Sequence, residues 1–110
     1  MGDGQHAWAA AEWAMMIRNC FVREEGNELV IASGVRPEWW RGGPASLGPV
    51  LTPFGPVTVH VTGTALGAEV HVSAKWRTPA PRLQIRLPGF SSQDRIPAET
   101  DSQFNLTTPL

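Results

Sequence analysis

Two histidines in alternating segments are the first residues of this chain whose spacing could do chemistry. His60 lies in Val57–Thr62 and His71 lies in Ala68–Trp76, and both segments alternate apolar with polar residues. A period of two is typical of strands with one buried and one wet face. Directly opposite residues of an antiparallel pair have Cβ atoms about 5 Å apart, so two opposed imidazoles could share a metal ion.

The register of this hairpin decides whether the histidines meet. Pairing Thr62 with Glu69 places the two histidines opposite each other, with Glu69 one polar position along. In the alternative register Thr62 pairs with Gly67, and His60 then faces Glu69. Neither register supplies a third or fourth ligand nearby, and a solvated sheet face commonly carries histidines that bind nothing. We therefore expect no metal and no cofactor, with His60 and His71 as weak metal candidates.

Adjacent tryptophans form the second candidate site. Trp39 and Trp40 lie between Glu38 and Arg41, and Pro37 is well placed to begin a single helical turn. Neighbours on such a turn point in different directions, so one tryptophan can fill the core while the other offers an aromatic face to a sugar ring. Packing in a core or interface is the more common role of such residues. Ligand binding by Trp39, Trp40 and Arg41 is the alternative.

Residues suited to nucleophilic catalysis lack partners at workable spacing. Cys20 lies on an apolar segment without an adjacent histidine, and a buried cysteine of that kind behaves as a small hydrophobe. Ser33 and Ser46 stand outside any G-x-S-x-G elbow. Glu24 and Glu25 are sequence neighbours on a charged link, where their side chains diverge. The sequence predicts that the protein is not an enzyme.

Length and charge limit the class of protein. The chain has 110 residues and a formal net charge of -1, which fits one small domain and gives no basic surface for nucleic acid. Its single cysteine, Cys20, rules out an internal disulfide. No secretory signal and no apolar run of membrane-spanning length are visible. We expect a cytoplasmic protein that binds neither nucleic acid nor membrane.

A helix is predicted from Ala7 to about Phe21, because no glycine or proline interrupts a run rich in Ala, Trp and Met. One side carries apolar residues at helical spacing, namely Trp13, Met16, Ile17 and Cys20. The opposite side is apolar too, and a helix of that kind is usually buried on more than one side. One small sheet cannot cover both sides, so we expect a homo-oligomer. The residues assigned to its interface are Trp8, Met15 and Val22.

The fold class that these patterns predict is α+β, with the helix packed on a small, mostly antiparallel sheet of four or five strands. Further strands are predicted over 28–32 and 82–87, with a short edge strand near Val50–Leu51 among four prolines. Residues 1–90 form the predicted domain, and the polar residues 91–110 a tail that is disordered or lies on a neighbouring subunit. The predicted core comprises Trp13, Met16, Ile17, Leu29, Ile31, Val57, Val59, Val61, Val70, Val72, Trp76, Leu83, Ile85 and Leu87.

Four short segments carry a resemblance to a known group of proteins: Met16–Gly26 (M-I-R-N-C-F-V-R-E-E-G), Glu28–Ile31, Pro37–Trp40 and Thr52–Val57. Over roughly residues 8–88 the chain resembles the C-terminal end of bacterial multidomain glycoside hydrolases built on an (α/α) toroid. There the last toroid helix runs into a small β-domain. The resemblance implies that the catalytic carboxylates belong to the toroid, so no catalytic residue is carried over to this chain. It also implies a carbohydrate-related accessory role.

Three functions follow as expectations. The leading one is a non-catalytic structural or protein-interaction module that self-associates, because the apolar surface exceeds what one sheet can bury. The second is a module that binds a small molecule or carbohydrate through the Trp39–Trp40 turn. An independent small enzyme is the third and weakest. If a C-terminal fragment of a toroid enzyme became a separate gene, the toroid-facing side of its helix would be left bare.

Overall fold

The computed structural model describes residues 3–77 and 79–108, with side chains from residue 12 onward. Over these residues, one α-helix, one 3-10 turn and eight strands follow each other. Their bounds are α1 Asp3–Phe21, β1 Val22–Glu25, β2 Glu28–Ile31, η1 Pro37–Trp39, β3 Ala45–Thr52, β4 Gly55–Thr64, β5 Gly67–Ala74, β6 Leu83–Ile85, β7 Gln93–Arg95 and β8 Asp101–Leu106.

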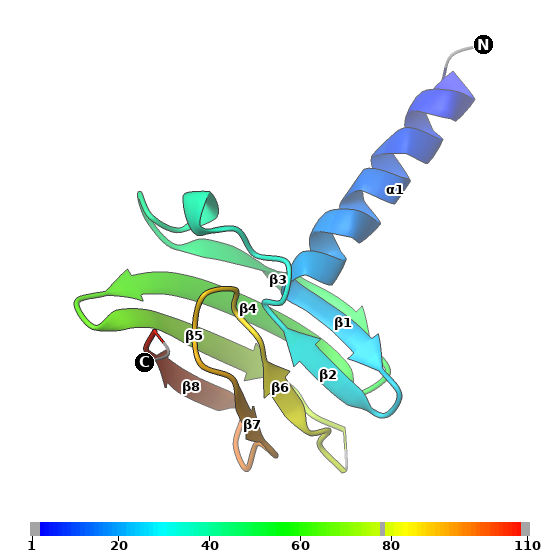
Figure 1. Cartoon of the computed structure of the whole chain (residues 1–110). Helices are drawn as coiled ribbons and strands as arrows, with labels where there is room; N and C mark the ends of the chain where they lie inside the picture. Colours follow the sequence, from blue (N-terminus) through cyan, green and yellow to red (C-terminus); the bar gives the residue numbers. More distant parts are fainter. Residues whose placement is uncertain (1–2, 78, 109–110) are drawn as a thin grey trace.

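The strands form two sheets of four strands each, ordered β1-β2-β6-β7 and β3-β4-β5-β8. Every pairing is antiparallel except that of β2 with β6, which is parallel. Buried side chains of both sheets belong to one apolar cluster, so the sheets cover each other (Figure 1). The predicted α+β class with mostly antiparallel strands is confirmed. A second sheet raises the number of strands above the four or five expected from the sequence.

The β4–β5 hairpin has the register that opposes the histidines. Thr62 pairs with Glu69, and His60 pairs with His71. Because strand side chains alternate between faces, this register buries the valines completely, with Val59 opposite Val72. The prediction of this register is confirmed, and the hairpin forms the centre of its sheet.

The C-terminal segment differs from the predicted tail. Residues Gln93–Arg95 form β7 beside β6, and Asp101–Leu106 form β8 beside β5. Phe104 and Leu106 are buried, and they alternate with exposed polar residues. The alternation is easily missed because its first inward residue is Ser102. The disordered or arm-like tail after residue 90 was therefore a wrong prediction, since this segment supplies one edge strand of each sheet.

Helix α1 does not lie across a sheet face. It meets the sandwich through its last residues and projects away from it (Figure 1). Trp13 and Met16 are 63% and 60% exposed, so their predicted place in the core was wrong. The second sheet covers the face that the helix was expected to cover. Phe21 and Val22 are buried where α1 passes directly into β1, which leaves the rest of the helix outside.

The proline-rich stretch forms more regular structure than its composition predicts. β3 runs over Ala45–Thr52 as an edge strand paired with β4, and its register shifts between Leu47 and Val50. Pro49 lies in this bulge, where the missing backbone N–H interrupts no regular ladder bond. An edge strand was expected here, and the bulge lets it extend past the proline.

Candidate interaction surface

Three large apolar side chains are exposed in the second half of α1. Trp13, Met15 and Met16 are 63%, 54% and 60% exposed. At 100° per residue, Trp13 and Met16 lie on one side of the helix and Met15 lies on the opposite side. Ile17 and Cys20, nearer the sandwich, are partly buried against the core. We call Trp13, Met15 and Met16 the apolar helix surface.

The predicted interface residues have different positions in the structure. Met15 is exposed and belongs to the apolar helix surface. Val22 is completely buried and pairs with Ile31 at the start of β1, so its assignment to an interface was wrong. The assignment assumed that Val22 lies on the helix, seven residues after Met15. Helix α1 ends at Phe21, so Val22 is already part of β1. The side chain of Trp8 lies outside the described part of the chain.

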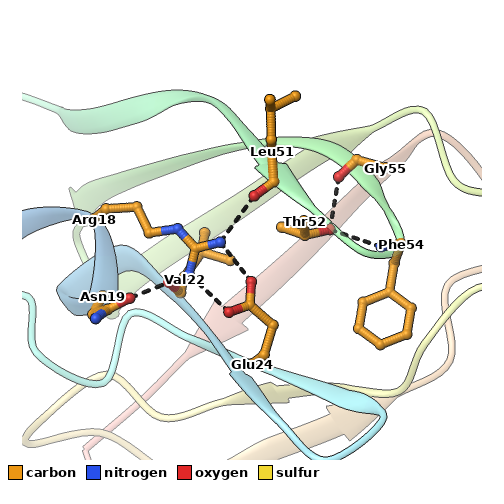
Figure 2. A network of polar contacts seen from close by, with 8 residues as sticks. All are labelled: Arg18, Asn19, Val22, Glu24, Leu51, Thr52, Phe54 and Gly55. Carbon is orange, nitrogen blue, oxygen red and sulfur yellow. Dashed lines mark hydrogen bonds and ion pairs between the residues drawn. The ribbon is translucent and has the colours of Figure 1, made fainter. Parts of the chain in front are cut away.

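Arg18 ties the end of α1 to both sheets (Figure 2). Its guanidinium donates hydrogen bonds to the backbone carbonyl of Val22 in β1 at 3.0 Å and to that of Leu51 in β3 at 2.9 Å. It also forms a two-pronged ion pair with the carboxylate of Glu24, one N–O distance being 3.1 Å. Bidentate pairs of this kind restrict geometry as well as adding energy. The network therefore fixes the direction in which α1 leaves the sandwich.

Replacing Arg18 tests this network. We expect Arg18→Ala to lower the free energy of unfolding by about 1–2 kcal/mol, because bonds to two backbone carbonyls and a carboxylate are lost while water partly replaces them. Chemical denaturation followed by circular dichroism measures the change. The control is Arg23→Ala, since the ion pair of Arg23 among the described residues is an exposed one, with Glu25 at 2.8 Å. Equal losses in the two variants would contradict the special role of Arg18.

The same network makes stability depend on pH. The hydrogen bond from Arg18 holds the pKa of the Glu24 carboxyl below its usual value of 4.5, against an opposing effect of burial. Folding therefore gains from the ionised carboxylate above the unfolded pKa, and this gain is lost as the pH falls through the lower folded pKa. The same sign holds for Asp94, whose pKa is lowered chiefly by a hydrogen bond from Arg86.

Glu24→Gln isolates the contribution of this carboxylate. We expect the variant to be less stable than the wild type at neutral pH, and the difference to shrink as the pH falls below about 4.5. Urea titrations at a series of pH values measure it. A difference that is constant over the whole series would show that the charge of Glu24 contributes nothing.

Arg95 links the two sheets at the edge opposite to β1 and β3. Arg95 in β7 donates to the carbonyl of Gln103 in β8 at 3.3 Å, and its guanidinium carbon lies 4.2 Å from the centre of the Phe104 ring. Gln93 donates to the carbonyl of Asn105 at 2.8 Å. Side-chain donors over an outermost strand hinder the addition of another strand. This favours α1 over β8 as a surface for a partner.

The two histidines lie together on the outer face of their sheet. Their ring centres are 5.8 Å apart and the planes differ by 25°. Nε2 of His71 lies 3.2 Å from a carboxylate oxygen of Asp101, which comes from β8 and was missed in the sequence. Within the described residues, no group of three or more His, Cys, Asp or Glu side chains is arranged to hold a metal ion. The opposed imidazoles were predicted, and they stack on each other.

The tryptophan turn is largely part of the core. Trp40 is 8% exposed and its ring packs 5.8 Å from that of Phe90, so it offers no face to a sugar and its assignment to a ligand site was wrong. Trp39 is half-buried and stacks on Phe21 at 6.0 Å. Arg41 is exposed. A stacking role at this turn would rest on Trp39 alone, and its contact with Phe21 links the turn to the end of α1.

Comparison with known proteins leaves the family open. No family model matches the chain, and neither curated proteins nor solved structures gave a match. The resemblance to the C-terminal region of toroid glycoside hydrolases thus stays a prediction. In the part of the chain that the structure describes, no helix is both long and apolar enough to cross a membrane.

Proposed function

We propose that this protein is a non-catalytic interaction module that associates with a second copy of itself through α1. The observation that supports the proposal is the apolar helix surface, in which Trp13, Met15 and Met16 are each more than half exposed. Scattered single apolar residues are ordinary on a protein surface, whereas large ones gathered on one projecting element mark contact sites.

The energetics favour covering this surface. Removing apolar area from water stabilises a contact by about 25 cal/mol per Å². Helix α1 joins the sandwich at its C-terminal end and projects from it (Figure 1). In the described part of the helix, exposed apolar side chains stand on opposite sides. A second copy offers the same surface, so two helices can cover each other in a symmetric pair. The Arg18 network supports this arrangement because it holds both helices in a fixed direction before they meet.

The polar clusters support a non-catalytic role. His60 and His71 stack on each other, and the Asp101 carboxylate is the acidic group beside them. Cys20 is partly buried near the core and packs close to Gly34. An acid, a base and a nucleophile at mutual hydrogen-bonding distance would favour an enzyme, and these residues do not supply that set.

Sedimentation velocity over a wide range of concentration tests the proposal. We expect the wild type to change from 12.0 kDa toward twice that mass as its concentration rises, and Met16→Glu to remain monomeric because the charge would have to be buried. The matched control is Leu66→Glu, since Leu66 is 84% exposed in the β4–β5 turn and should associate like the wild type. A wild type that stays at 12.0 kDa at every concentration would overturn self-association.

A further inference from the structure

An open groove of ≈ 510 Å³ lies at one end of the sandwich, away from the apolar helix surface. It forms where the β1–β2 turn, the β3–β4 turn and the connector between β5 and β6 come together (Figure 1). Its volume is within the usual range for sites that hold a small molecule. The lining residues used below are Glu28, Phe54, Arg77, Pro81, Arg82 and Ile96.

The walls of this groove are held by backbone and side-chain hydrogen bonds. The hydroxyl of Thr52 donates to the carbonyl of Gly55 at 2.7 Å and accepts from the amide of Phe54 at 3.0 Å, which fixes the β3–β4 turn (Figure 2). The amide of Arg77 donates to the carbonyl of Phe54 at 2.9 Å. The amide of Leu29 donates to the carbonyl of Arg82 at 3.0 Å. These bonds hold the β3–β4 turn, and they attach both ends of the β5–β6 connector to neighbouring segments.

The charges of the groove favour an anion. Arg77 and Arg82 line it, and among the described residues neither forms an ion pair, unlike Arg18, Arg23 and Arg86. Its acidic residue, Glu28, accepts a hydrogen bond from the Gln84 amide at 2.8 Å. Nη1 of Arg77 donates a long hydrogen bond of 3.5 Å to the carbonyl of Pro53. Both guanidinium groups keep further N–H donors that suit a carboxylate.

Arg82 also acts on Asp94, but weakly. The carboxylate of Asp94 is bound by Arg86 at 2.6 Å, and this hydrogen bond is the main cause of its lowered pKa. The charge of Arg82 adds a smaller effect, and among the described residues Arg82 forms no ion pair with Asp94. Its guanidinium therefore remains available to a ligand in the groove.

Apolar side chains complete the site. Phe54 is half-buried, Ile96 is 61% exposed, and Pro53, Pro79, Ala80 and Pro81 line the groove beside them. We propose that this groove binds a small carboxylate with an aromatic or aliphatic body. The carboxylate pairs with Arg77 and Arg82, and the apolar body lies against Phe54, the prolines and Ile96.

Ligand-observed and protein-observed NMR with 3-phenylpropionate test this proposal. We expect saturable shifts of the amide signals around Phe54, Arg77 and Ile96, and binding at least about tenfold weaker for the uncharged 3-phenylpropionamide. Arg82→Glu should abolish the shifts, because it replaces a hydrogen-bond donor with a negative charge that repels the carboxylate of the probe. The matched control is Arg36→Glu, an exposed arginine outside the groove, which should bind like the wild type.

Several outcomes would overturn the carboxylate site. They are the absence of saturable shifts, equal binding of the acid and the amide, or an equal loss in Arg82→Glu and Arg36→Glu. Unchanged melting temperatures of Arg82→Glu and Arg36→Glu show that both variants keep the fold. If Arg82→Glu is unstable, Arg82→Gln is the milder variant to test. Met16→Glu should bind the probe normally, which separates this site from self-association through α1.

Discussion

Phe104→Ala is expected to lower the free energy of unfolding by about 3–5 kcal/mol, the usual cost of emptying a buried aromatic site. Phe104 is completely buried, and its strand β8 completes the sheet beside β5. The variant also removes the ring beneath the Arg95 guanidinium. For a small domain with total stability of about 5–15 kcal/mol, this loss is a large fraction. Chemical denaturation followed by tryptophan fluorescence measures it.

Asn105→Ala is the control for this prediction. Asn105 is the next residue of the same strand, and its side chain is exposed, so truncating it should change stability by less than about 0.5 kcal/mol. A Phe104→Ala variant as stable as Asn105→Ala would mean that the C-terminal segment is not an integral part of the sandwich.

Gly55→Ala is expected to cost about 3 kcal/mol or more, because two independent effects oppose a side chain there. Gly55 has φ +119°, a conformation that suits glycine. A Cβ atom at this position would also collide with the backbone carbonyl oxygen of Lys75, which cannot move without disturbing β5 and its connector.

Gly42→Ala provides the matched control, measured by the same denaturation experiment. A Cβ atom at Gly42 would meet no atom within 4 Å. We expect that variant to be as stable as the wild type or slightly more stable, since alanine restricts the unfolded chain. Similar stabilities of the two alanine variants would contradict the tight approach of the β3–β4 turn to the β5–β6 connector.

Strands with clean alternation were predictable from the sequence. The hairpin around His60 and His71, and the inward residues of β2 and β6, follow from a period of two. β8 alternates as well, but its polar outward residues and Ser102 made it resemble a disordered tail. Counting Ser102 as an inward residue extends the alternation through Phe104 and Leu106 and predicts β8.

The place of α1 depends on information that periodicity does not contain. An apolar stripe predicts that a helix contacts something, and it does not say whether the partner is a sheet of the same chain or another molecule. Here β1, β2, β6 and β7 supply the second layer, so Trp13 and Met16 are left outside. The sequence predicted that α1 carries excess apolar surface. It did not predict that Trp13 and Met16, which were expected in the core, belong to that surface.

The groove could not be predicted because its residues come from segments that are distant in the sequence. Glu28, Phe54 and Arg82 meet only when both sheets are formed. Val22 and Trp40 show the reverse case: their positions suggested an interface and a ligand site, and both side chains are buried. The role of Arg18 also depends on a distant segment, because one of its partners, Leu51, lies in a different sheet from β1.

Distances between spin labels on two copies test most directly the claim that α1 is the contact between them. Labels attached at Glu12→Cys, in a Cys20→Ser background, should give a defined distance between copies, since Glu12 is exposed beside the apolar helix surface. Adding Met16→Glu should remove this signal. A defined distance between copies for labels at Leu66→Cys, with none for labels at Glu12→Cys, would place the contact at the β4–β5 turn and contradict the account.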